Sequence, residues 1–145
     1  MTERVDFYVL KRADPKARQL FACRLAEKAY LKKFNVLVLA ADEAQARAMD
    51  DLLWTFNDDS FVPHALGLNG ESDPLSPVTI ATEPGSAAHA DLVLNLGEHG
   101  PDSLQRFARV AEVIDADQER RRRGRERFKT YRDAQVTLET HQLDE

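Results

Sequence analysis

The sequence of 145 residues contains a single cysteine, Cys23. One cysteine excludes an internal disulfide and any zinc site built from several cysteines, which agrees with a reducing compartment. Long hydrophobic runs are missing as well, because the longest one, Val36–Ala41, is far too short to cross a bilayer. The stretch Met1–Val5 carries charges where a signal peptide has its apolar core. We therefore expect a soluble, cytoplasmic protein with no membrane contact.

The sequence also lacks a glycine-rich turn where a nucleotide-binding sheet needs one. Such a turn follows the first strand, so that backbone amides and a helix N-terminus hold the phosphates. The corresponding turn here, Lys11–Pro15, has no glycine, and its Asp14 would repel a phosphate. No P-loop pattern occurs elsewhere in the sequence. We predict no nucleotide cofactor and no nucleotide-dependent enzyme.

Patterns of other catalytic and metal sites are missing too. No two histidines have the spacing that places two ligands on one helix face, and neither a nucleophile elbow nor a cysteine–histidine pairing occurs. His64 is interpreted as a hydrogen-bonded loop residue. The acidic pairs Asp50–Asp51 and Asp58–Asp59 are interpreted as solvated surface. The sequence thus predicts no catalytic residue, no metal ligand and no cofactor.

Strand and helix patterns alternate along the chain. The continuous apolar run Val36–Leu39 is typical of a strand that is covered on both faces, and therefore of a parallel sheet. We predict an α/β fold, a Rossmann-like, mainly parallel sheet of about five strands flanked by helices, in a single domain over residues 1–138. Residues 139–145 are expected to form a polar C-terminal tail that frays from His141. The expected strands are Val5–Leu10, Val36–Leu39, Val78–Thr82, Leu92–Leu96 and Val110–Asp115; the expected helices are residues 15–32, 42–57 and 117–134, with one helical turn at Ser103–Phe107 and a loop at Leu66–Pro77.

Aromatic residues gather around the end of the second predicted helix. Trp54 and Phe56 precede the polar turn Asn57–Ser60, and Phe61 follows it. Two interpretations remain open at this point. The side chains cap the core beneath a sheet edge, or they form a partner interface, since aromatic residues on a loop beside a helix are good anchors.

The net charge of −5 hides an uneven distribution. Residues 118–132 carry eight basic side chains against two acidic ones, which leaves −11 for the rest of the chain. Helical spacing places one apolar ring among several of these cations on a single face, while Gly124 and Tyr131 fall on an adjoining face suited to packing on the sheet. The face consists of Arg121, Arg125, Phe128, Lys129 and Arg132.

Such a face has three interpretations. It is a solvated charged surface, it binds phosphate backbones, or it binds a peptide that combines carboxylates with an aromatic end. The acidic remainder of the chain favours the peptide. The main alternative is a direct single-stranded nucleic-acid-binding protein that uses the arginine-rich helix, with Phe128 and Tyr131 as stacking surfaces.

Three segments stand out, namely Leu53–Trp54, Ser60–His64 with Leu66, and Arg125–Arg132. Together they resemble the chi subunit of the bacterial DNA polymerase III holoenzyme. The resemblance covers nearly the whole chain, although Leu66–Ala90 contributes little to it. It implies a Rossmann-like fold without nucleotide chemistry and a non-catalytic bridging role in the clamp-loader assembly, so that polymerase activity would belong to the complex. It also implies a cytoplasmic, nucleoid-associated location.

Two partners are implied by the resemblance. Chi subunits bind the acidic, phenylalanine-ended C-terminal tail of single-stranded DNA-binding protein on one side and the psi subunit on the other, so that contact with DNA is indirect or weak. Phe128 departs from the tyrosine of the family member used for comparison, and the run Arg120–Arg123 is more basic than expected. By position, the tail pocket would include Ile114, Arg121, Arg125, Phe128 and Lys129, and the psi-facing patch Trp54, Phe61, Pro63 and His64.

Overall fold

The computed structural model describes residues 2–68, 76–86 and 90–144. All strand pairings among these residues are parallel, and the strands form one sheet with helices on both sides, which confirms the expected α/β class. The sheet has seven strands where about five were expected. They are β1 (Arg4–Val9), β2 (Val36–Leu39), β3 (His64–Leu66), β4 (Val78–Ala81), β5 (Leu92–Asn95), β6 (Arg109–Ile114) and β7 (Thr137–Gln142).

The three long helices follow the expected positions, whereas the short helix expected at Ser103–Phe107 lies at Pro101–Leu104. Each long helix begins at an aspartate whose carboxylate accepts a backbone N–H three residues later, so that Asp14, Asp42 and Asp117 fix the start of the long helices. The long helices are α1 (Pro15–Leu31), α2 (Glu43–Thr55) and α4 (Gln118–Asp133); α3 (Pro101–Leu104) and the 3-10 turn η1 (Pro84–Ser86) are short.

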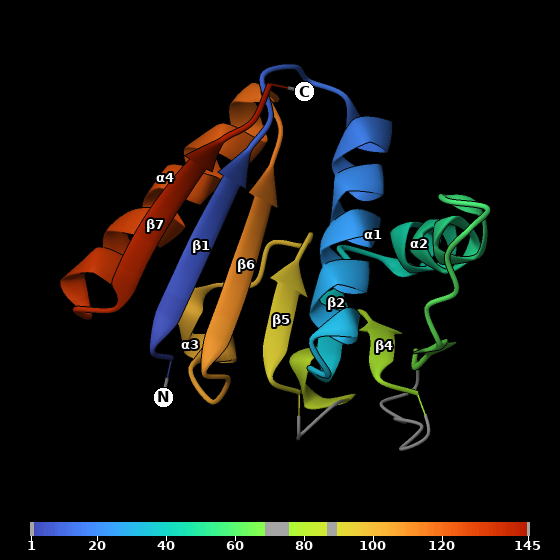
Figure 1. The fold of residues 1–145 in the computed structure, drawn as a ribbon. Helices are drawn as coiled ribbons and strands as arrows, with labels where there is room; N and C mark the ends of the chain where they lie inside the picture. The colour runs from blue at the N-terminus through green and yellow to red at the C-terminus, as the bar shows by residue number, and fades with distance from the viewer. Residues whose placement is uncertain (1, 69–75, 87–89, 145) are drawn as a thin grey trace.

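The strand order is β3-β4-β2-β5-β6-β1-β7. Helices α1 and α2 lie on one face of this sheet, and α3 and α4 lie on the other, as Figure 1 shows. Alternate residues of the central strands serve the two faces: Val38 packs with the core under α1 and α2, whereas Leu37 and Leu39 pack with the core under α3 and α4. The apolar run of β2 is fully buried for this reason.

Buried polar groups attach α4 to the sheet. Glu112 of β6 is 0% exposed, and its carboxylate accepts hydrogen bonds from Tyr131 (3.1 Å), from Asn95 (3.1 and 3.2 Å) and from Arg127 (3.2 Å). Tyr131 and Gly124 are the buried residues of α4, as their spacing predicts. A side chain at Gly124 would place its Cβ 2.4 Å from the Cδ1 atom of Ile114. Glycine therefore allows the helix to approach the end of β6.

Two edge strands differ from the expectations. The polar tail expected at residues 139–145 was wrong in its first part, because Thr137–Gln142 pair in parallel with β1 along its whole length. The sequence gives no clear strand signal here, because β7 is a largely exposed edge strand with few apolar residues. The short strand His64–Leu66 pairs with β4, so Leu66, the first residue of the expected loop Leu66–Pro77, lies in a strand. Residues 69–75 of that expected loop lie outside the described residues.

Candidate partner-binding surfaces

A pocket of about 230 Å³ opens between α4 and the sheet edge formed by β1 and β7. Four of the residues expected at the tail site line it, namely Ile114, Arg121, Arg125 and Phe128. Lys129 is exposed and does not line the pocket. The other lining residues, which the sequence reasoning missed, are Phe7 and Val9 of β1, Gly124 of α4, and Thr140 and Gln142 of β7.

The floor of this pocket is apolar. The rings of Phe7 and Phe128 meet edge to face with their centroids 5.3 Å apart, and Phe7 makes a second such contact with Tyr131 at 6.1 Å. Ile114 is 4% exposed and closes the end of the floor. Phe128 is fixed by a neighbouring ring, so the pocket is preformed and can receive one apolar group without rearranging the sheet.

The rim of the pocket is cationic. Arg121 donates hydrogen bonds to the carbonyl oxygens of Leu10 (3.2 Å) and Asp115 (3.4 Å), and it has no carboxylate partner among the described residues. Arg125 is exposed and makes no hydrogen bond or ion pair within the described part of the chain. Two guanidinium groups thus keep donor atoms for an outside anion above an apolar floor.

The remaining arginines of α4 are neutralised by nearby acids. Arg120 binds the buried carboxylate of Asp115 through two hydrogen bonds of 2.7 Å. Arg127 contacts Glu112 at 3.1 Å. Hydrogen bonds from Arg122 and Arg123 lower the pKa of Glu119 to about 2; Arg122 also pairs with Glu126, and Arg123 with Glu98. The local excess of basic residues is therefore much smaller as free charge than the sequence suggests.

The aromatic residues around the end of α2 form an exposed surface. Trp54 is 56% exposed and Phe61 is 63% exposed, with 5.7 Å between their ring centroids. The ring of Trp54 also lies 4.8 Å from that of His64. His64 is hydrogen-bonded as expected, with Nδ1 2.7 Å from the carbonyl oxygen of Val62, but it begins strand β3 where a loop residue was expected. Its side chain is 0% exposed, so the ring supports Trp54 from beneath the surface. Pro63 is half-buried beside them, while Val62 is buried and belongs to the core.

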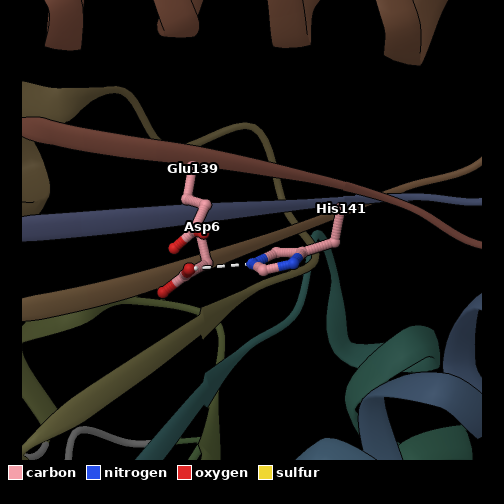
Figure 2. Close-up of side chains that lie close together, drawn as sticks. All are labelled: Asp6, Glu139 and His141. Atoms are coloured by element: carbon pink, nitrogen blue, oxygen red, sulfur yellow. Dashed lines mark hydrogen bonds and ion pairs between the residues drawn. The ribbon is translucent and has the colours of Figure 1, made fainter.

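A further group of polar side chains lies on the opposite face of β1 and β7. Asp6, Glu139 and His141 place one potential ligand atom each within 4.8 Å of one another (Figure 2). His141 contacts Asp6 at 3.0 Å, Arg4 pairs with both Asp6 and Glu139, and Arg109 lies 3.7 Å from Asp6. Two guanidinium groups already neutralise these carboxylates. The group therefore acts as an ion-pair network that joins β7 to β1.

No helix in the described parts of the chain is long and apolar enough to span a membrane. The fold is similar to that of a solved structure of T4 UvsW, with a TM-score of 0.68 over 99% of this chain and 42% of that chain. The two sequences are only 12% identical, so this likeness concerns the fold alone.

Sequence comparisons are more specific. The model of the family described as "DNA polymerase III chi subunit, HolC" matches residues 1–139. The chain is 40% identical to the DNA polymerase III subunit chi of Pseudomonas aeruginosa over 140 residues, which cover 97% of this chain and 96% of that protein. It is 30% identical to the subunit chi of Escherichia coli over 125 residues, or 86% and 84% of the two chains. The subunit chi of Haemophilus influenzae is 29% identical over 91% of this chain and 92% of its own length. The chain belongs to the DNA polymerase III chi subunit family.

Proposed function

We propose that this chain is a non-catalytic adaptor of the clamp-loader assembly, which links the replicative polymerase to single-stranded DNA-binding protein in the cytoplasm. One observation carries the proposal, namely the pocket with a phenylalanine and isoleucine floor beside the guanidinium group of Arg125, which has no partner among the described residues. An acidic peptide that ends in phenylalanine is complementary to it. The ring enters the apolar floor, and the terminal and side-chain carboxylates meet the cationic rim.

The capture has an electrostatic step and a packing step. The carboxylates of the tail are drawn to Arg121 and Arg125, while Lys129 adds a positive charge on the exposed side of the helix. The terminal ring then contacts Phe7, Phe128 and Ile114. Because Phe128 has no hydroxyl group, the ring contributes contact area and no hydrogen bond. Affinity should fall as salt is added, since the rim is open to solvent.

Calorimetry with Arg125→Ala tests the tail site. We expect this variant to bind an acidic, phenylalanine-ended peptide at least about tenfold more weakly, because a charge-assisted hydrogen bond is lost. Arg122→Ala is the matched control, since it removes the same charge from the outer side of α4, where Arg122 pairs with Glu119 and Glu126. Equal affinities of Arg125→Ala and the wild-type protein would show that the pocket is assigned wrongly. A peptide without the terminal phenylalanine should bind weakly to the wild-type protein and to Arg125→Ala.

We propose that the second surface, made by Trp54, Phe61 and Pro63 over the buried ring of His64, binds the psi subunit. This proposal is supported by two large aromatic side chains, Trp54 and Phe61, which are exposed beside each other. Contact of such apolar surface with water costs free energy, and a bound partner would remove that contact. Trp54→Ala should abolish copurification with psi and leave tail-peptide binding unchanged. Leu31→Ala is the control, because it truncates another exposed apolar side chain, 70% exposed, on a different helix. Retention of psi by Trp54→Ala would refute this part of the proposal.

Direct binding of single-stranded DNA is the competing function. The ion pairs of Arg120, Arg122, Arg123 and Arg127 argue against it, because they leave little net positive charge along α4 to attract an extended phosphate backbone. We therefore expect bare oligonucleotides to bind far more weakly than the acidic peptide at physiological salt. Tight oligonucleotide binding without the coating protein would reverse the order of the two functions.

A further inference from the structure

A second pocket, of about 250 Å³, lies at the carboxyl ends of the central strands. Its walls include Asp42 after β2, Leu96–Glu98 after β5, and Ile114 at the end of β6. The connections that follow the adjacent strands β2 and β5 run to opposite faces of the sheet here, since β2 leads to α2 on one face and β5 leads to α3 on the other (Figure 1). Crevices at such a reversal are where open parallel sheets hold their ligands.

Four arginines line this pocket, one from α1 and three from α4. Arg120, Arg123 and Arg127 have the carboxylate partners described above. Arg18 differs from them, since it is only 4% exposed and contacts no carboxylate among the described residues. Its Nε and Nη2 atoms donate to the carbonyl oxygens of Val113 and Leu96, both at 2.8 Å.

The Nη1 atom of Arg18 takes part in none of the hydrogen bonds found among the described residues, although the side chain lines the pocket. Burial, and then the nearby charge of Arg120, lower the pKa of Arg18 to about 10. The charges of Asp115 and Glu112 act on this pKa in the opposite direction. An anion in the pocket that accepts a hydrogen bond from Nη1 would offset the repulsion between Arg18 and Arg120.

The acidic residues of the rim limit which anion fits. Asp42 accepts the N–H of Gln45 at the start of α2, and Glu98 and Glu119 hold Arg123. A ligand with a single negative charge would compete poorly with these carboxylates. A ligand with several charges and several acceptor oxygens competes better. The ligand must also be compact, because the volume of the pocket lies below the usual range for sites that bind drug-sized molecules.

We propose that this pocket binds the phosphate or diphosphate group of a small molecule, held by Arg18, Arg120 and Arg123. The missing glycine-rich turn after β1 does not bear on it, because the pocket is built from the ends of β2, β5 and β6 and from arginine side chains. The site is distinct from the tail pocket, since Arg125 and Phe128 do not line it, although Ile114 lines both pockets.

The test is calorimetric titration of the full chain with inorganic pyrophosphate at constant ionic strength, together with thermal unfolding. The wild-type protein should bind one equivalent saturably and unfold at a higher temperature when it is bound. Arg123→Gln should weaken binding about tenfold or more, because it removes a charged donor from the exposed rim. Arg18→Lys keeps the charge but loses Nη1 together with the donors to Val113 and Leu96, and it should weaken binding as well. Arg122→Gln is the control, as Arg122 lies on the same helix outside the pocket.

A titration with ADP shows whether the bound diphosphate group belongs to a nucleotide or is free. Tighter binding of ADP than of pyrophosphate identifies a nucleotide, and equal or weaker binding identifies a free diphosphate. The proposal is overturned if the wild-type protein shows no saturable binding up to about 10 mM pyrophosphate, which corresponds to less than about 3 kcal/mol. It is also overturned if Arg122→Gln loses as much affinity as Arg123→Gln. Loss of pyrophosphate binding in Arg125→Ala alone would place the anion in the tail pocket and refute the second site while leaving the adaptor function intact.

Discussion

Tyr131→Phe should destabilise the protein without changing its shape, because it removes one buried hydroxyl group. That hydroxyl donates to the carboxylate of Glu112, which is 0% exposed, at 3.1 Å. A hydrogen bond to a buried charge contributes about 1.5–3 kcal/mol. Glu112 retains Asn95 and Arg127 as donors, so we expect a loss of about 1.5–2 kcal/mol, at the lower end of this range. The melting temperature should fall by roughly 3–8 °C.

Urea denaturation followed by far-UV circular dichroism measures this loss. Tyr30→Phe is the matched control, because the hydroxyl group of Tyr30 makes no hydrogen bond within the described residues and the ring is only partly buried. Its free energy of unfolding should change by less than about 0.5 kcal/mol. If the two variants were equally stable, the Glu112 network would not hold α4 on the sheet.

Two further changes test the pocket and the ion-pair network. Gly124→Ala brings a Cβ atom within 2.4 Å of the Cδ1 atom of Ile114. Overpacking costs about 1–3 kcal/mol and helix propensity returns about 1 kcal/mol, so the free energy of unfolding should fall by about 0–2 kcal/mol. The tail-peptide affinity should drop as well, and unchanged affinity in calorimetry would refute this. Burial raises the pKa of Asp6, but hydrogen bonds from Arg4 and His141 outweigh it, and the pKa lies below 3.8. The charged form therefore stabilises the fold above the unfolded pKa, and this contribution is lost as the pH falls through the lowered folded pKa. Asp6→Asn should lose less stability than the wild type as the pH falls below about 4, and parallel losses in acid unfolding would contradict this.

The sequence predicts the central part of this fold well, because hydrophobic runs such as Val36–Leu39 are governed by burial on both faces. It fails at the edges of the sheet. Thr137–Gln142 carries a polar pattern because one side of β7 faces solvent, and propensity alone does not separate such a strand from a tail.

The candidate sites divide in the same way. Helical spacing was sufficient to place Arg121, Arg125 and Phe128 on one face, since it depends only on residues within α4. The partners of Arg120 and Arg123 could not be predicted, because Asp115 and Glu98 reach them from other elements. The buried Glu112 carried no sequence signal, as a carboxylate in a strand is ordinarily exposed.

The position of β7 affects how the protein is made. The tail pocket needs Phe7 and Val9 from β1 together with Thr140 and Gln142 from β7, so its walls come from segments that are synthesised more than a hundred residues apart. A ribosome-bound chain can form the sheet from β1 to β6 and still lack the outer wall of the pocket. Under the proposed function, an unfinished chain whose Gln142 has not yet left the ribosome would therefore bind the acidic tail poorly.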